Sequence, residues 1–249
     1  MCTVTLMPCS TGREEILRIA CNRDESKSRR LALPPELRTF GNRRAVLPID
    51  PACDGSWIAV SDAGLAIVIL NRNPGDLPVN SAPLSRGAIL PLLLHCDSLR
   101  SAENLALDLN GNCFAPFRLI LTTRTEASVI DGGGSTVLTA QHLAISRPLM
   151  FTSSGLGDAL VEEPRRRLFN EMCPESMCQP EQQDLFHRHS WPGASHLSVC
   201  MRRTDARTVS HTLIELERHL AIMSYLPHAP DQPGPSVAMS LPLETKVPA

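Results

Sequence analysis

The second residue of the chain carries both of the groups that a self-contained nucleophile needs. Cys2 follows the initiator Met1, and aminopeptidases remove an initiator methionine when the next residue is small, so we expect the mature chain to begin with Cys2. Its thiol titrates near ~8.5 and its α-amine near ~8, so at neutral pH the amine can take the proton of the thiol during attack on a carbonyl. The alternative is that Cys2 is one more small buried hydrophobe, as most free cysteines are.

A predicted β-hairpin brings an acidic residue to the neighbourhood of Cys2. Strand-like apolar runs at residues 1–6 and 16–25 flank a turn at residues 8–12 that is rich in proline, serine, threonine and glycine. The second strand returns Asp24 to the start of the first, where its carboxylate could hold the α-amine in position and tune its charge. Thiol, amine and carboxylate would then serve as nucleophile, base and orienting group.

Four short segments carry a resemblance to a known family. The opening Met-Cys-Thr-Val, the run Cys-Asn-Arg-Asp-Glu at residues 21–25, the run Gly-Ser-Trp-Ile-Ala at residues 55–59 and Ser-Arg-Gly at residues 85–87 are similar to motifs of the NRDE family, which includes the eukaryotic Transport and Golgi organisation proteins. The similarity runs from Met1 to about Tyr225. That family in turn resembles the N-terminal nucleophile (Ntn) hydrolases of the penicillin acylase and bile salt hydrolase kind, whose mature chains start at cysteine.

The resemblance implies an α+β fold, a four-layer αββα sandwich of two antiparallel sheets between helices. In the bile salt hydrolase kind, an asparagine at the end of the corresponding strand donates to the developing oxyanion, and Asn71 matches that placement; the alternative for Asn71 is a cap of the following turn. A second asparagine of these hydrolases falls near Ser154, where this sequence departs and offers a hydroxyl of shorter reach. Arg207 is a candidate counterpart of the arginine near their nucleophile, although Arg202 or Arg203 would serve as well.

Candidate binding residues lie beside the predicted catalytic groups and within the same motifs. Asn22 and Arg23 directly precede Asp24, Trp57 lies in the Gly-Ser-Trp-Ile-Ala run, and Arg86 lies in the Ser-Arg-Gly run. Arg86 could face the ligand, but an ordinary surface arginine is the alternative. The expected ligand is a small-molecule amide or acyl compound.

Composition excludes several classes of protein. A formal net charge of -2 and an aromatic content of 4% leave neither the basic surface nor the stacking side chains that nucleic-acid binding requires. The nine cysteines are odd in number and lack a disulfide framework, so we expect reduced thiols in the cytoplasm. No run approaches the roughly twenty apolar residues of a membrane helix, and the N-terminus lacks the pattern of a signal peptide.

Apolar periodicity predicts the remaining elements. The predicted strands, joined by turns, lie at residues 54–61, 65–71, 117–123, 127–131, 136–138, 142–145, 197–201 and 208–214. The predicted helices lie at residues 85–96, 97–109 and 162–172, and residues 26–48 and 173–183 are predicted as loops. We expect one domain over residues 1–226, followed by a proline-rich, disordered tail at residues 227–249.

A histidine-rich segment supports an alternative function. His187, His189, His196 and Cys200 could form a metal site if the first two shared one face of a strand, although a polar rim or a structural role is the favoured interpretation. The eukaryotic relatives suggest a role in haem movement, so haem is a candidate ligand even though no Cys-x-x-Cys-His attachment motif is present. No other cofactor is expected.

Together, these patterns predict an N-terminal-cysteine amidohydrolase that acts on a non-peptide amide. Cys2 attacks the carbonyl, its own amine moves the proton, Asp24 fixes that amine, and Asn71 with a backbone N–H stabilises the oxyanion. Water then releases the acyl group. The alternatives are a non-catalytic binding or trafficking protein of the same fold, handling haem or lipid, and a purely structural interaction module.

Overall fold

The computed structural model describes residues 2–10, 14–73, 84–133, 138–174 and 178–244, and within these ranges the chain forms two antiparallel β-sheets. Sheet A has the strand order β10-β1-β2-β11-β12-β13, and sheet B has the order β3-β4-β5-β6-β7-β8-β9. The strands are β1 (Cys2–Ser10), β2 (Glu15–Ser26), β3 (Leu33–Phe40), β4 (Arg43–Ile49), β5 (Ile58–Ser61), β6 (Ala66–Asn71), β7 (Phe117–Thr122), β8 (Glu126–Gly132), β9 (Thr139–Ala144), β10 (Leu149–Thr152), β11 (Ala206–Leu216), β12 (Leu220–Leu226) and β13 (Val237–Pro242). The helices are η1 (Arg86–Ala88), α1 (Ile89–Leu93), α2 (Leu99–Leu107), η2 (Gly111–Cys113), α3 (Asp158–Met172) and α4 (Pro180–Arg188).

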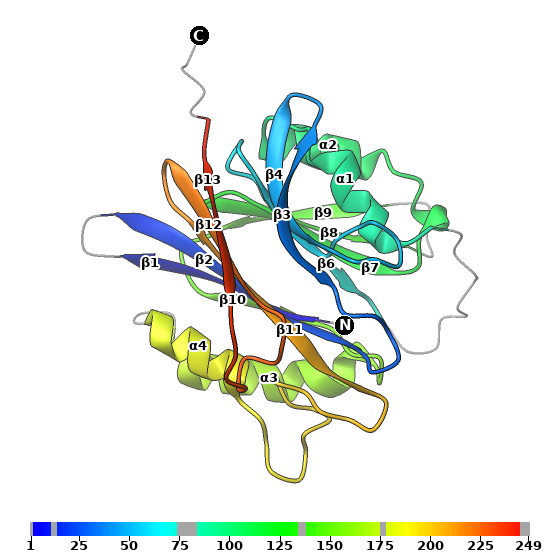
Figure 1. Ribbon diagram of the computed structural model, residues 1–249, viewed down its shortest axis with the longest axis vertical. Helices are drawn as coiled ribbons and strands as arrows, with labels where there is room; N and C mark the ends of the chain where they lie inside the picture. The colour runs from blue at the N-terminus through cyan, green and yellow to red at the C-terminus, as the bar shows by residue number, and fades with distance from the viewer. Residues whose placement is uncertain (1, 11–13, 74–83, 134–137, 175–177, 245–249) are drawn as a thin grey trace.

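The two sheets pack face to face, and the α-helices cover their outer faces (Figure 1). Helices α1 and α2 contact β6, β7 and β8 of sheet B, whereas α3 and α4 contact β1, β2 and β10 of sheet A. The predicted four-layer αββα sandwich of the α+β class is therefore confirmed. Among the described residues, no helix is both long enough and apolar enough to cross a membrane.

The main core lies between the two sheets and beneath α1 and α2. Residues 66–70 of β6 are all buried because sheet B is covered on both faces. The strands of sheet A alternate instead: Val4 and Leu6 pack in the inter-sheet core, whereas Thr3 and Thr5 contact side chains of α3 and α4. Odd and even residues of β1 therefore face different layers of the molecule.

The N-terminal hairpin is present and longer than predicted. Its register runs without interruption from Cys2 opposite Arg23 to Ser10 opposite Glu15. Pro8 lies inside β1, where the missing proline N–H breaks no bond to the other neighbouring strand because β10 stops pairing before that point. The pairing therefore continues through residues 8–10, which were predicted to belong to the turn.

The predicted loop at residues 26–48 is wrong, because this segment contains β3 and β4. The Pro34–Pro35 pair is tolerated because β3 is the edge strand of sheet B and because its register is irregular between Leu33 and Glu36. Gly41, with a φ of 59°, makes the turn between the two strands. Prolines that indicate a loop in isolation here occupy a sheet edge.

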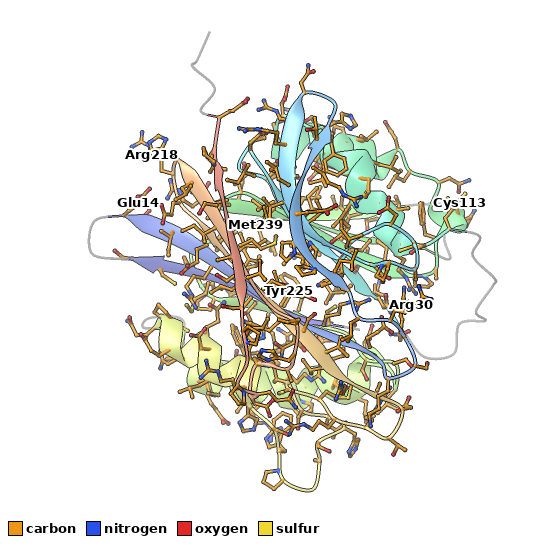
Figure 2. The ribbon with its side chains drawn as sticks, viewed as in Figure 1. Glu14, Arg30, Cys113, Arg218, Tyr225 and Met239 are labelled. Atoms are coloured by element: carbon orange, nitrogen blue, oxygen red, sulfur yellow. The ribbon has the colours of Figure 1, made fainter. Side chains whose placement is uncertain are left out.

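The tail predicted to be disordered from residue 227 contains a strand instead. Residues 237–242 form β13, which pairs with β12 at the edge of sheet A, and Leu241 is buried in the inter-sheet core. Tyr225 of β12, labelled in Figure 2, is buried one strand further in. Large apolar residues at 237, 239 and 241 alternate with smaller residues in this segment, a strand pattern that the high proline content of the tail concealed.

The region before β11 also differs from the prediction. Residues 180–188 form α4, which starts with a proline at a position that favours helix initiation, so His187 lies on a helix and His189 at its C-terminal cap. Residues 197–201 do not form a strand, and the closing hairpin is β11–β12, with β11 also paired to β2. Helix α3 begins at Asp158, before its predicted start.

Candidate active site

Cys2 is the first residue of β1, and its side chain points into the space between the sheets. It packs in the inter-sheet core with 4% of its surface exposed, whereas Thr3, on the opposite face, contacts α3. The backbone N–H of Cys2 donates to Oγ of Ser153 (3.1 Å), and the N–H of Ser153 donates to the carbonyl oxygen of Cys2 (2.9 Å). These bonds fix the start of β1 against the segment that follows β10.

The surroundings of Cys2 favour its thiolate. A hydrogen bond with the thiol of Cys21 lowers the pKa of Cys2 below its usual value, and this effect outweighs burial, which alone would raise it. The same hydrogen bond raises the pKa of Cys21, so Cys21 remains the protonated partner. Because the thiolate is the attacking form of cysteine, the arrangement suits a nucleophile.

Asp24 lies next to the strand partner of Cys2 and is buried. The hydroxyl of Thr208 donates to Oδ1 of Asp24 (2.6 Å). Burial raises the pKa of Asp24, and the positive charge of Arg165 and the Thr208 hydrogen bond oppose that rise. Among the smaller effects on Cys2, the charge of Asp24 raises the pKa of the thiol, so the two groups are within electrostatic reach of each other.

Arg165 of α3 is a charged residue beside the site that the sequence analysis missed. Its guanidinium is buried and donates to Oγ1 of Thr3 (2.8 Å) and Oγ1 of Thr152 (2.7 Å). It also donates to the carbonyl oxygens of Leu197 (2.9 Å) and Ser198 (2.7 Å). Arg165 therefore joins α3, β1, β10 and the segment before β11 directly behind the candidate nucleophile.

A sequence signal for the burial of Arg165 did exist. Val161 and Phe169, four residues before and after it, are buried on the same face of α3. Arg165 is the first of three consecutive arginines, and it alone of the three is buried, whereas Arg166 and Arg167 are exposed and form ion pairs with Glu162 and Glu163. Burial lowers the pKa of Arg165, and the charge of Asp24 opposes that fall.

Arg23 stands opposite Cys2 in the register of β1 and β2 and shares its face of sheet A. Nη2 of Arg23 donates to Asp50 (2.8 Å) and to Glu25 (3.1 Å), and the guanidinium carbon lies 4.4 Å from the centre of the Trp57 ring. Arg23 and Trp57 are 5% and 6% exposed. Both predicted binding residues therefore lie between the sheets, with an arginine stacked on an aromatic face.

The Gly-Ser-Trp and Ser-Arg-Gly motifs pack against each other, which positions Trp57. A Cβ atom on Gly55 would lie only 2.6 Å from the carbonyl oxygen of Gly87, and the N–H of Ser56 donates to that same oxygen (3.3 Å). Only glycine permits so close an approach of two backbones. The two motifs, far apart in sequence, therefore form one structural unit beside the site.

Arg86, predicted to bind a ligand, instead contacts the backbone. Its Nε donates to the carbonyl oxygens of Ala115 (3.1 Å) and Pro116 (2.9 Å), which lie just before β7. Burial lowers the pKa of Arg86 below its usual range. The side chain thus holds η1 against the residues that lead into β7. This structural role differs from both predicted alternatives, a ligand contact and a surface arginine.

Asn71 is the last residue of β6 and lies on the face of sheet B that looks toward sheet A. The N–H of Ile69 donates to the carbonyl oxygen of Trp57 (2.9 Å), so Ile69 and Trp57 are opposite each other and share a face of sheet B. That face looks toward sheet A, because Arg23 of sheet A stacks on the Trp57 ring. Asn71 follows two residues after Ile69 on the same face. Among the described residues its side-chain amide has no hydrogen-bond partner, so it remains available to donate. Its role at an oxyanion stays a prediction.

The loop that bears Ser154 is tied to the end of β6 by Asp158. Oδ1 of Asp158 accepts the N–H of Ser154 (2.8 Å), and its Oδ2 accepts the N–H of Asn73 (2.8 Å). The hydroxyl of Ser154 accepts the N–H of Leu156 (3.1 Å), which leaves its own hydrogen to donate. Asp158 therefore joins the segments that carry the two predicted oxyanion donors, and the role of Ser154 stays a prediction.

Arg207 does not occupy a position that suits its predicted role. It is the second residue of β11, pairs with Glu25 in the register and has an exposed side chain. Of the alternatives, Arg202 forms an ion pair with Asp231 and Arg203 with Asp205. The charge of Arg203 is among the smaller effects that lower the pKa of Asp24, so Arg203 stays a candidate. The buried positive charges near the nucleophile are those of Arg23, which stacks on Trp57, and Arg165 of α3.

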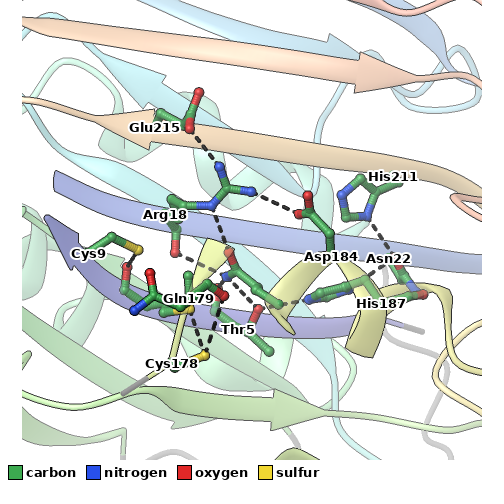
Figure 3. Close-up of polar contacts among 12 residues, drawn as sticks. Thr5, Cys9, Arg18, Asn22, Cys178, Gln179, Asp184, His187, His211 and Glu215 are labelled. Carbon is green, nitrogen blue, oxygen red and sulfur yellow. Dashed lines mark hydrogen bonds and ion pairs between the residues drawn. The ribbon is translucent and has the colours of Figure 1, made fainter. Parts of the chain in front are cut away.

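Asn22, predicted as a binding residue, is the centre of a buried polar network between sheet A and α4 (Figure 3). Its Nδ2 donates to the carbonyl oxygens of His187 (2.8 Å) and Val199 (3.0 Å). Its Oδ1 is 3.1 Å from Nδ1 of His187 and 2.8 Å from Nδ1 of His211. Every donor and acceptor of the amide is therefore used, so Asn22 has no group left for a ligand.

His187 is neutral in this network. Its Nδ1 faces an amide oxygen and so carries the proton, which leaves Nε2 to accept from the hydroxyl of Thr5 (2.8 Å). Burial lowers the pKa of His187 well below its usual range and lowers that of His211 to about 3. With both ring nitrogens engaged, His187 cannot serve as a haem or metal ligand in this conformation.

The same network continues along α4 to Arg18 (Figure 3). Nε2 of Gln183 donates to the hydroxyl of Thr5 (2.8 Å), and Oε1 of Gln183 accepts from Nε of Arg18 (3.1 Å). The guanidinium of Arg18 also forms ion pairs with Asp184 (2.8 Å) and Glu215 (2.7 Å). These contacts fix α4 to β1, β2 and β11.

The remaining candidates for metal or haem binding do not form a ligand set. His196 is exposed, and burial raises the pKa of the Cys200 thiol to about 12. Across the part of the chain that the structure describes, no group of three or more histidine, cysteine, aspartate or glutamate side chains could hold a metal ion. Of the histidine-rich segment, the buried His187 has a structural role in the fold.

Comparisons with known proteins support the fold rather than a family. No family model and no curated protein matches the chain, so neither the NRDE resemblance nor the Golgi and haem roles that it implied gain support. Solved structures do match. A Caenorhabditis elegans N-acylethanolamine-hydrolyzing acid amidase ortholog is 12% identical over 93% of this chain and 94% of its own, with a TM-score of 0.56.

Two structures of the conjugated bile acid hydrolase from Clostridium perfringens also match. The C2A mutant is 11% identical over 95% of this chain and 92% of its own, with a TM-score of 0.52. The R18L variant is 10% identical over 98% of this chain and 99% of its own, with a TM-score of 0.50. At these identities the likeness concerns architecture, and the chain has the Ntn-hydrolase fold.

Proposed function

We propose that the protein is an N-terminal-cysteine amidohydrolase that cleaves a non-peptide amide through an acyl-enzyme on Cys2. The observation that carries the proposal is the environment of Cys2, which lies at the start of β1 between the sheets with a lowered pKa. The carboxylate of Asp24 is within electrostatic reach. Removal of Met1 adds a free amine at the same residue, which completes a nucleophile, a base and an orienting carboxylate.

The reaction proceeds in two halves. Sγ of Cys2 bonds to the amide carbon while its proton moves to the α-amine, and Asn71 with a backbone N–H stabilises the oxyanion. Collapse of this intermediate breaks the C–N bond, the ammonium returns the proton to the leaving amine, and a thioester remains on Cys2. Water then attacks the thioester and gives a proton to the α-amine, which returns it to the thiol as the carboxylic acid leaves.

The names of the fold neighbours support small-molecule amides as the proposed substrate class. One neighbour is named as hydrolysing N-acylethanolamines and the other as a hydrolase of conjugated bile acids. Small-molecule amides are therefore the first compounds to test on this chain. The nine cysteines are unpaired, which suits a reducing compartment, and we propose the cytoplasm.

Covalent labelling tests the proposal. The protein is incubated with an activated acyl amide, and the acylated residue is located by peptide mass mapping. We expect acylation of Cys2, loss of that acylation in Cys2→Ala, and no loss in Cys9→Ala. Cys9 is the matched control because it lies on the same strand, and burial raises the pKa of its thiol to about 11. Acylation at any other residue, or none at all, would contradict the proposal.

The oxyanion donor is tested separately. Replacing Asn71 with alanine should slow acylation about 10²–10³-fold, as removal of one oxyanion donor does in other hydrolases, without changing the thermal unfolding temperature. Asn104→Ala is the control, since Asn104 is an exposed asparagine of α2. An unchanged acylation rate in the Asn71 variant would assign that residue to the turn instead.

A further inference from the structure

Two buried donors beside Cys2 have no acceptor. Within the described part of the chain, Nη1 of Arg23 and Nε1 of Trp57 are buried without a hydrogen-bond partner, and both residues are more than nine-tenths buried. Leaving a buried donor unsatisfied costs about 1–3 kcal/mol, and most such groups in folded proteins are paired. Two adjacent exceptions next to a candidate nucleophile require an explanation.

The two donors are held rigidly. The other terminal nitrogen of Arg23 is bonded to both Asp50 and Glu25, and the guanidinium stacks on the Trp57 ring at 4.4 Å. Trp57 is in turn fixed by the packing of Gly55 against the backbone of Gly87 in the Ser-Arg-Gly motif. A donor pair that is fixed before a ligand arrives is the arrangement that gives selective recognition.

The donor pair belongs to the surroundings of the reacting sulfur. Arg23 is the strand partner of Cys2 on the same face of sheet A. The hydrogen bond with Cys21 is the main cause of the lowered pKa of Cys2, and the charge of Arg23 is a smaller effect in the same direction. A substrate whose amide carbon reaches Sγ therefore also places its neighbouring atoms close to the two donors.

The charges around the pair select a neutral acceptor. Arg23 and Arg29 are both bonded to Asp50, and both also contact Glu25, so two positive charges face two negative ones. A carboxylate arriving here would add an unbalanced buried charge, which is costly. An uncharged carbonyl oxygen has two lone pairs and can accept from both donors without altering the balance.

We infer that Arg23 and Trp57 form a subsite for a second, uncharged carbonyl oxygen of the substrate, close to the scissile amide. The inference rests on the proposed amidohydrolase function and narrows its substrate class to amides that carry such an oxygen. It follows from the unpaired donors Nη1 and Nε1, their fixed geometry and their position opposite Cys2.

Three matched acylating amides test the subsite. They differ only in bearing a carbonyl, a methylene or a carboxylate at one position near the scissile bond, and the measured quantity is the second-order rate of Cys2 acylation. We expect the carbonyl compound to react at least tenfold faster than either of the others. Trp57→Phe, which keeps an aromatic ring but removes the indole N–H, should reduce this ratio, whereas Trp191→Phe should leave it unchanged. Equal rates, or the carboxylate reacting fastest, would overturn the inference.

A binding measurement separates this inference from the proposed function. In the Cys2→Ala protein, unreactive carbonyl and methylene compounds are titrated while the indole N–H resonances are recorded by NMR. The chain has two tryptophans, so Trp191→Phe identifies the Trp57 resonance. The inference predicts a downfield shift of that resonance with the carbonyl compound only. The absence of a shift would overturn the subsite. If the Trp57 resonance shifts but the wild-type protein is never acylated at Cys2, only the amidohydrolase proposal is overturned.

Discussion

Replacing Asn22 with leucine separates a structural role from a ligand-binding one. Leucine is similar in size to asparagine but removes all of its polar groups. Nδ1 of His187, Nδ1 of His211 and the carbonyl oxygens of His187 and Val199 then lose their partner. At about 1 kcal/mol for each of four buried groups, the low end of the usual range, the free energy of unfolding should fall by about 4 kcal/mol.

The assay is urea unfolding at pH 7, supported by thermal unfolding. A loss of about 4 kcal/mol corresponds to a fall in Tm of about 8–16 °C for a chain of this size. Asn104→Leu is the control, because an exposed helical position should change stability by no more than about 0.5 kcal/mol. If the Asn22 variant were as stable as the control but failed to acylate, Asn22 would be the binding residue that the sequence indicated.

Three further predictions concern buried groups. The folded-state pKa values of His187 and His211 lie below their usual 6.5. The contribution of the two histidines to stability is therefore present above about pH 6.5 and is lost as the pH falls, by up to about 2.7 kcal/mol per pH unit for two protons. Urea titrations at pH 7, 6 and 5 measure this slope. Thr208→Val removes the hydroxyl that lowers the pKa of Asp24, so the acidic limb of the acylation profile should move to higher pH, whereas Thr208→Ser should retain the wild-type profile. Leu241→Ala should reduce the free energy of unfolding by about 2–4 kcal/mol in urea, because Leu241 is 2% exposed.

Each of these predictions has a contrary outcome. A free energy of unfolding that does not change between pH 7 and pH 5 would show that the histidines titrate in the folded protein as they do in water. If the free energy does fall, His211→Gln should reduce its dependence on pH. An identical pH profile in Thr208→Val would remove Asp24 from the reaction. A stable Leu241 variant, no different from a Val237→Ala control at a more exposed position of β13, would mean that the C-terminal strand does not contribute to the core.

The N-terminal hairpin and the antiparallel meander could be predicted because local patterns specify them. Alternating apolar residues and a short turn are sufficient to pair β1 with β2, and this pairing places Cys2 opposite Arg23, the residue before Asp24. The continuous apolar run of β6 similarly indicates a strand covered on both faces. These elements depend on interactions between residues that are near in sequence.

Residues whose environment depends on distant segments were not predictable in the same way. Arg165 is buried because Thr3, Thr152 and two carbonyl oxygens of a remote loop surround it. Asn22 has the same kind of hidden partners, since His187 and His211 lie far along the chain. A polar residue in a strand pattern gives no indication of whether its neighbours in space are water, ligand or another buried polar group.

Strands β3 and β13 illustrate a different difficulty. Both are edge strands, and both lie in segments whose prolines indicate a loop when composition is read without topology. An edge strand pairs on one side only, so it tolerates a proline that a central strand would exclude. Because position within a sheet is not known from one sequence, the loop and the disordered tail were the reasonable but wrong expectations.

Intact and peptide mass analysis of the purified protein, before and after reaction with an activated acyl amide, tests the central claim most directly. The account predicts that the untreated chain lacks Met1 and that the reacted chain gains one acyl group, located on the N-terminal peptide beginning with Cys2. A chain that retains Met1, or an acyl group on a different residue while Cys2 stays unmodified, would contradict it.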